Sequence, residues 1–456
     1  MATTATLPAT AARPARRAAG QGAVPPEANR DLKWGIWAYI ILIILEGALR
    51  RWVLPSLATP LLIVRDPIAL WLMVAAWRRG LLPANPYLAG TLFIGILGII
   101  SALLVGHGNL AVALYGARIL LLHFPLIFVI GRIFNRADVL RVGQAFVWMT
   151  PAMALLIAVQ FYSPQSAFVN RGVGGDLAGA GFDGAMGFFR PPGTFSFTNG
   201  THMFFGLAAC FVCYFWLDLK RINRLVLTAA TVGLLSAIPF SISRSLLLYV
   251  TTAGLFTVIG LLRKPKNLGR VLLLGLGGCV LLLALSRVSI LQTPIEAFVS
   301  RFTDASDVEG GLRGSLGNRY LGGMLEALIN SSQQPFFGYG IGMGTNAGSA
   351  ILTGERSFII SEGEWGRLIG ELGPLLGIGI IFIRMALSVK LTAACYQRLL
   401  RDDLLPWILL GNALLMIPQA QWAQPTALGF STLIAGLVIA VLRPASTASS
   451  FHSVAT

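Results

Sequence analysis

Residues 404–442 read LLPWILLGNALLMIPQAQWAQPTALGFSTLIAGLVIAVL and contain no Asp, Glu, Lys or Arg. A helix needs about 20 apolar residues to cross a bilayer, so this run has room for two spans separated by the polar turn at 418–425. Similar uncharged runs occupy residues 80–117, 142–170 and 191–217. Together these runs predict an all-α, polytopic integral membrane protein.

The composition favours the same conclusion. Only 12% of the residues are charged, whereas soluble domains carry roughly 25%. The net charge of +16 does not indicate nucleic-acid binding, because the cations lie at the ends of apolar segments and not on one compact face. We expect twelve spans, at 34–54, 57–77, 87–105, 110–131, 140–161, 200–218, 223–239, 244–262, 270–290, 366–388, 404–420 and 425–442.

The lysines predict the orientation of these spans. If the N-terminus lies inside, every lysine falls on an inner segment, as the positive-inside rule requires. The lysines are Lys33, Lys220, Lys264, Lys266 and Lys390. Residues 1–33 then form a disordered cytoplasmic tail, 34–442 the transmembrane domain, and 443–456 a second cytoplasmic tail. Two large loops, 163–199 and 291–365, are predicted to face the periplasm.

The second outer loop contains the longest polar stretch between apolar spans. Residues 314–371 read GSLGNRYLGGMLEALINSSQQPFFGYGIGMGTNAGSAILTGERSFIISEGEWGRLIGE. Loops longer than about 12–15 residues are uncommon unless they are functional or disordered. The apolar residues Leu321, Met324, Leu325, Leu328 and Ile329 have the spacing of an amphipathic helix. The glycine-rich run GYGIGMG follows no strand, so it does not fit a nucleotide-binding loop.

Several ionisable residues lie within the predicted spans, where charges are usually paired or functional. Glu46 and Arg50 are four residues apart in the first span, and Arg65 and Asp66 open the second. We interpret these four residues as a structural ion-pair network at the outer ends of neighbouring helices.

Four arginines on the outer side are candidates for binding an anion. Arginine presents a planar fork that grips phosphate or carboxylate with two hydrogen bonds. The candidates are Arg118, Arg190, Arg244 and Arg319. Two prolines follow Arg190 directly and hold its backbone in a fixed conformation. The alternative is that these arginines are structural, for example by capping backbone carbonyls.

Four segments resemble the O-antigen ligase and polymerase superfamily, bacterial inner-membrane enzymes of surface polysaccharide assembly. They are RPPGTFSFTNGT (190–201), SISRSLLL (241–248), NRYLGGMLEALINSSQQPFFGYGIGMG (318–344) and EWGRLIGELGPLLG (364–377). Ligases of this family usually carry a histidine near the end of the outer loop. Here Glu362 and Glu364 stand at that place, so the resemblance points to a polymerase of exopolysaccharide or O-antigen.

The resemblance implies a reaction and a location. An oligosaccharide linked to undecaprenyl pyrophosphate would be transferred to a sugar hydroxyl at the periplasmic face of the inner membrane. Such a glycosyltransferase needs no metal, cofactor or nucleotide sugar. Its expected partners are the lipid-linked oligosaccharide, the lipid bilayer and a chain-length regulator of polysaccharide export, with no nucleic acid.

This reaction assigns roles to the candidate residues. The diphosphate leaving group needs cations, for which the four arginines are available, and the acceptor hydroxyl needs a general base. We favour Glu364 over Glu362 as the base, because Glu364 and Arg367 are i and i+3 if a helix begins there. The alternative is that both carboxylates only cap the N-terminus of that helix.

Other functions also fit the sequence. A ligase would move finished glycan to another acceptor, and a transporter or flippase would carry lipid-linked glycan across the membrane. Transporters often show repeated halves and broken helices, and the sequence contains no evident repeat. A structural partner of an export complex is a further alternative.

Overall fold

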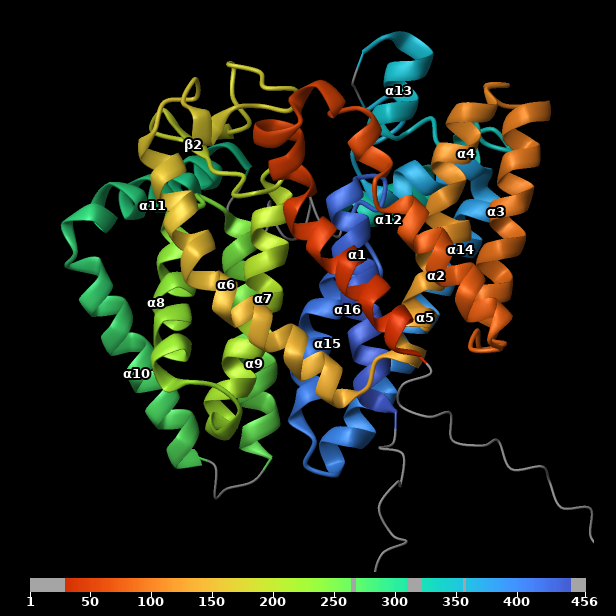
Figure 1. The fold of residues 1–456 in the computed structure, drawn as a ribbon. Coiled ribbons are helices and arrows are strands. Elements are labelled where there is room, and N and C mark those ends of the chain that lie inside the picture. Colours follow the sequence, from red (N-terminus) through yellow and green to blue (C-terminus); the bar gives the residue numbers. More distant parts are fainter. Residues whose placement is uncertain (1–28, 264–267, 310–321, 356–357, 444–456) are drawn as a thin grey trace, which may run out of the picture.

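The computed structural model describes residues 29–263, 268–309, 322–355 and 358–443 (Figure 1). Apart from one small hairpin, these residues form helices and the turns between them. Nine helices in the described part of the chain are long and apolar enough to cross a membrane. They are Arg30–Val53, Pro60–Arg78, Pro86–Leu104, Leu110–Ile133, Arg136–Tyr162, Asn199–Leu217, Arg244–Leu262, Glu364–Leu400 and Pro425–Leu442. The prediction of a helical, polytopic membrane protein is confirmed.

Three further expected spans take a different form. The helices α8 (Arg224–Phe240) and α15 (Leu404–Met416) are apolar but have only 17 and 13 residues. The helices α10 (Leu268–Ser286) and α11 (Ser289–Glu309) meet at a bend of 104°. A total of twelve spans therefore stays a prediction.

The remaining elements have these bounds in chain order. They are α1 (Arg30–Ala48) with the π-helical turn Leu49–Val53, the 3-10 turns Pro55–Leu57 and Pro60–Ile63, α2 (Asp66–Arg78), α3 (Pro86–Leu104), α4 (Leu110–Arg118), the π-helical turn Ile119–His123, α5 (Phe124–Ile133), α6 (Arg136–Tyr162), the 3-10 turn Phe168–Asn170, β1 (Phe182–Ala185), β2 (Phe188–Arg190), α7 (Asn199–Leu217), the 3-10 turn Leu219–Arg221, α9 (Arg244–Leu262), α12 (Gly323–Ile329), the 3-10 turn Asn330–Gln333, α13 (Asn346–Thr353), α14 (Glu364–Leu400) and α16 (Pro425–Leu442).

Polar caps determine where several helices begin. Asn85 precedes α3 and accepts a hydrogen bond from the backbone N–H of Leu88 at 2.8 Å, with Pro86 at the first helical position. At the start of α6, Asn135 and Asp138 form a reciprocal capping box. Such caps satisfy N–H groups that have no partner within the helix.

Helix α14 is two helices joined at a sharp break. Gly373 has φ +77° inside it, and Pro374 follows. In a straight helix, Glu364 and Arg384 would be about 30 Å apart, yet their side chains are 2.6 Å apart. Residues 364–372 therefore fold back against residues 374–400, and the expected span 366–388 contains this break.

Helix α16 lies at the centre of the bundle, between α1, α5, α7 and α15 (Figure 1). The outer helices carry large apolar side chains on their exposed sides. Trp77, Phe93 and Phe382 are 70%, 62% and 70% exposed, which is the arrangement expected of side chains that face lipid.

One end of the bundle collects the lysine-bearing segments, and we call it the lysine face. It comprises the start of α1, the end of α2 and the turns 134–135, 218–223 and 401–403. Lys33 contacts Asp138 at 2.6 Å, and Arg136 contacts Asp403 at 2.6 Å. These contacts join segments that the sequence assigns to the inner side. Which compartment this face meets stays a prediction.

The opposite end, which we call the loop face, comprises residues 49–58, 163–198, 338–355, 358–363 and 417–424 (Figure 1). Its first long loop carries the antiparallel hairpin of β1 and β2. The π-helical turn Leu49–Val53 after α1 holds this loop, since the Arg51 Nη1 donates to the carbonyls of Gly193 at 2.9 Å and Phe195 at 3.0 Å. Besides this hairpin, the loop contains the 3-10 turn Phe168–Asn170.

The ion-pair network expected between the first two spans is present. The Glu46 carboxylate lies 3.0 Å from Arg65 and 3.5 Å from Arg50, and all three side chains are buried. Asp66 instead pairs with Arg118, whose contacts are described below.

The two faces predict opposite labelling of introduced cysteines. We expect Ala178→Cys on the loop face to react with a membrane-impermeant maleimide in intact spheroplasts. Lys220→Cys on the lysine face should react only after permeabilisation. Both positions are exposed, and the background should lack the four native cysteines. Labelling of both positions from the same side would contradict the predicted topology.

Candidate functional site

Glu364, the first residue of α14, is held by four hydrogen bonds. Arg367 donates to it through Nε at 3.1 Å and Nη2 at 3.0 Å, and Arg384 through Nη1 at 2.6 Å. The backbone N–H of Trp422 adds a fourth bond at 3.1 Å. The Glu364, Arg367 and Arg384 side chains are all buried. The predicted pairing of Glu364 with Arg367 is confirmed.

Arg384 extends this cluster to the turn between α15 and α16. It donates to the carbonyls of Ile417 at 2.6 Å and Ala420 at 3.1 Å, and its guanidinium lies 4.2 Å from the centre of the Trp422 ring. The turn 417–422 is thus fixed to both halves of α14. The sequence analysis missed Arg384, although a single cation inside an apolar run is a signal for a paired or functional residue.

Glu371 attaches the glycine-rich run 338–344 to the same helix. Its carboxylate accepts from Arg367 Nη1 at 2.5 Å and from the backbone N–H of Gly344 at 2.8 Å. Gly338 lies against the break at Gly373, where an added Cβ would come within 2.5 Å of the backbone. Only glycine fits such a close approach with φ +70°.

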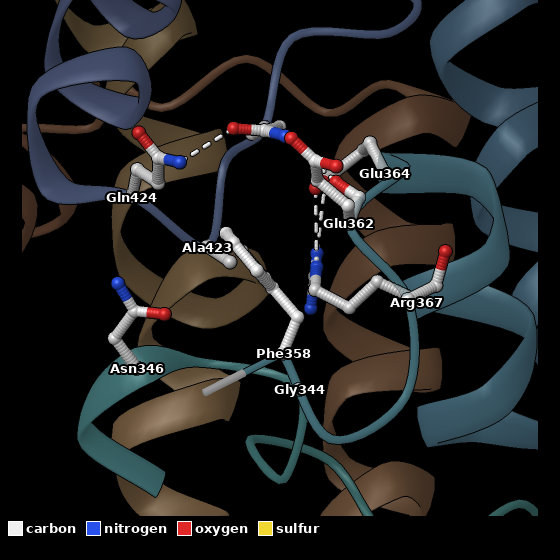
Figure 2. A pocket seen from close by; sticks show the side chains of 10 residues that line it. Gly344, Asn346, Phe358, Glu362, Glu364, Arg367, Ala423 and Gln424 are labelled. Carbon is white, nitrogen blue, oxygen red and sulfur yellow. Dashed lines mark hydrogen bonds and ion pairs between the residues drawn. The ribbon is translucent and has the colours of Figure 1, made fainter. Parts of the chain in front are cut away.

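Glu362 differs from Glu364 because it is exposed. Its carboxylate makes no hydrogen bond or ion pair with any residue that the structure describes. It lies at a small pocket of about 10 Å³ on the loop face, which we call the Glu362 pocket (Figure 2). The lining residues are Gly344, Asn346, Phe358, Ser361, Glu362, Glu364, Arg367, Gln421, Ala423 and Gln424. Since a water occupies about this volume, the enclosed part has room for one small polar group.

Three side-chain amides connect this pocket to the first outer loop. The Asn199 amide contacts Gln424, and Gln424 Nε2 donates to Gln421 Oε1 at 2.5 Å. Gln421 Nε2 then donates to the backbone carbonyl of Glu362 at 2.7 Å. Gln424 and Gln421 therefore link Asn199 to Glu362, although 163 positions separate these two residues in the sequence.

Arg190 and Arg244 do not line this pocket. Arg190 ends β2, with its guanidinium 4.6 Å from the centre of the Phe182 ring. Arg244 begins α9, in which the Tyr249 ring packs 5.3 Å from His202 of α7. Both arginines are half-buried.

Arg118 occupies a different environment. Its Nη1 donates to both oxygens of Asp66, at 3.0 and 3.1 Å, and its guanidinium stacks 4.0 Å from the Tyr115 ring. His123 contacts the same Asp66 carboxylate at 2.9 Å. Arg118 thus lies among Asp66, Tyr115 and His123, and Arg319 lies outside the described residues. A cavity shared by the four arginines stays a prediction.

The described residues contain no group of three or more His, Cys, Asp or Glu side chains placed to hold a metal ion. Comparisons of the chain with protein-family models, curated proteins and solved structures found no match. The function must therefore be argued from the arrangement of the site itself.

The Glu364 cluster predicts a strong effect of Glu364→Gln on stability. The change leaves two buried guanidinium groups without their shared carboxylate, and breaking a buried ion pair costs about 3–5 kcal/mol. We expect a clear fall in the thermal unfolding midpoint of the purified protein in detergent. Glu362→Gln, at an exposed carboxylate two residues away, is the matched control and should leave the midpoint unchanged. Equal midpoints for both variants would contradict the structural role of Glu364.

Proposed function

We propose that this protein is a membrane glycosyltransferase that polymerises undecaprenyl-pyrophosphate-linked oligosaccharide repeat units into exopolysaccharide or O-antigen. The proposal rests on the contacts between parts of three of the four segments that carry the family resemblance. Asn199 of 190–201 is linked through Gln424 and Gln421 to the backbone of the exposed Glu362, and Gly344 of 318–344 donates to Glu371 of 364–377. Segments that are distant in sequence and polar in composition converge in this way when they build a shared site.

The chemistry of the reaction matches the groups that this site offers. The acceptor hydroxyl attacks the anomeric carbon of the donor sugar, and the bond from that carbon to the diphosphate oxygen breaks. The hydroxyl proton passes to a carboxylate, and undecaprenyl pyrophosphate leaves as an anion. A base and a cluster of cations are the two groups that this reaction needs.

Glu362 suits the role of base better than Glu364 does. A general base must lie within hydrogen-bond reach of the proton that it removes. Glu362 is exposed at the pocket, whereas both oxygens of Glu364 accept hydrogen bonds from Arg367, Arg384 and Trp422. Proton transfer to Glu364 would break one of these bonds. We therefore assign the proton transfer to Glu362 and the structural role to Glu364.

Arg190 and Arg244 are the described candidates for the diphosphate. Arg190 ends β2 on the loop face and Arg244 begins α9, and both side chains are half-buried. The Nη1 of Arg118 donates to both oxygens of Asp66. The diphosphate of the donor would then bind beside β2 and α9.

The first test is the reaction itself. Purified protein in nanodiscs, given a lipid-linked repeat unit and no nucleotide, should produce a ladder of polymer lengths. Glu362→Gln should slow the ladder by about 10²–10⁴-fold, the usual contribution of a positioned base, with an unchanged unfolding midpoint. A single transfer product would indicate a ligase, and the absence of any glycan product would contradict the proposal.

The second test concerns the planar guanidinium group of Arg190. Arg190→Lys keeps the charge but loses the bidentate geometry, so we expect slower ladder formation by normally folded protein. Arg224→Lys, at an exposed arginine on the lysine face, is the matched control and should leave the rate unchanged. Full activity of Arg190→Lys would show that the guanidinium does not grip the diphosphate.

A further inference from the structure

The three amides of Asn199, Gln424 and Gln421 form a relay with a fixed direction. The backbone carbonyl of Glu362 can only accept, so the Gln421 group that contacts it must be the NH₂ donor. Gln421 Oε1 must then accept from Gln424, and Gln424 Oε1 from Asn199. No flip of a single amide preserves all three bonds. The relay therefore has one chemical orientation.

This relay spans the starts of three helices. Asn199 is the first residue of α7, Gln424 directly precedes α16, and Glu362 lies two residues before α14. Since each of these helices is packed in the bundle, the relay fixes the backbone of Glu362 relative to a rigid frame. The relay thus fixes the backbone from which the Glu362 side chain projects, through residues that do not themselves need to touch a ligand.

The charge of the Glu362 pocket selects a type of ligand. Glu364 and Glu371 are balanced by Arg367 and Arg384 in the buried cluster. Among the residues that line the pocket, Glu362 then carries a negative charge that no cation of the cluster balances. Binding of an anion is therefore disfavoured. The exposed carboxamide of Asn346 and the ring of Phe358, which is 47% exposed, lie at the same opening (Figure 2). A carboxylate, an amide and an aromatic face together suit a neutral sugar, which offers hydroxyls and an apolar ring face.

The size of the pocket further restricts which part of a ligand can enter it. An enclosed volume of about 10 Å³ admits one hydroxyl but not a sugar ring. The ring would therefore rest at the opening, beside Phe358, with one hydroxyl directed toward Glu362.

We propose that the Glu362 pocket is a carbohydrate subsite that takes a single hydroxyl of the acceptor sugar, and that the amide relay positions Glu362 for it. The acceptor role rests on the proposed polymerase function, whereas binding of a sugar does not. Gln421, Gln424 and Asn199 are positioning residues in this scheme.

The test is direct binding of simple glycosides. Methyl glycosides of glucose, galactose, mannose and N-acetylglucosamine are added singly to the protein in nanodiscs, and contact is measured by saturation-transfer NMR. We expect transfer to at least one of them. Gln421→Met keeps the length of the side chain but cannot donate, so the affinity for that glycoside should fall about two- to tenfold, as expected for one misplaced hydrogen-bonding group.

The matched control is Gln144→Met. Gln144 Nε2 also donates to a backbone carbonyl, that of Arg221 at 2.6 Å, but on the lysine face. This variant should bind the glycoside like the unchanged protein. Gln424→Met interrupts the relay one bond earlier and replaces Gln421→Met if that variant does not fold.

The outcomes separate the two proposals. No transfer to any glycoside, or equal affinity in the Gln421→Met and Gln144→Met variants, would overturn the subsite even if polymer ladders form. Transfer that depends on Gln421 in a protein that makes no polymer would support the carbohydrate subsite and overturn its acceptor role together with the polymerase. Transfer that depends on Gln421, combined with ladders that Gln421→Met slows, supports both.

Discussion

The Glu364 carboxylate, shared by Arg367 and Arg384, is the interaction on which the loop face depends. An ion pair far from water is stable only if every charge is matched and its remaining donors are satisfied. The cluster meets this condition by recruiting the backbone of 417–422 and the N–H of Gly344 through Glu371. The buried ion pairs thus connect the start of α14, the turn 417–422 and the run 338–344. The exposed Glu362 lies two residues before this start of α14.

Buried ion pairs also join helices on the other side of the bundle. Glu46 pairs with Arg65 and Arg50, while Asp66 pairs with Arg118 and contacts His123. Close packing of these large cations needs small neighbours. A Cβ on Gly429 of α16 would lie 2.0 Å from Arg65 Nη1, so this glycine makes room for the guanidinium. Arg65 is therefore accommodated both by its ion pair with Glu46 and by the lack of a side chain at Gly429.

The fold was predictable where its causes are local. The apolar runs predicted twelve spans, and nine helices in the described part of the chain are long and apolar enough to cross a membrane. The i, i+3 spacing predicted the Glu364–Arg367 pair. The bend in α14 was not predicted, because a Gly-Pro step inside an apolar run also fits a continuous helix. Without that bend, nothing in the sequence brings Arg384 to Glu364.

The candidate site was predictable only in part, for a related reason. The two carboxylates could be named from their place before a span, but their burial could not. That difference depends on Arg384 and Trp422, which are 20 and 58 positions from Glu364. The amide relay likewise joins residues from separate helices, and uncharged glutamines in a turn give no signal of their partners. Local patterns locate such residues, whereas long-range contacts assign their roles.

The brevity of α15 has a consequence for how this part of the chain crosses the membrane. This helix starts beside the lysine face and ends after 13 residues, a length of about 20 Å. The hydrocarbon core of a bilayer is about 30 Å thick, so α15 alone is too short to cross it. A crossing at α15 would need the turn 417–424 that follows it, or a locally thinner bilayer.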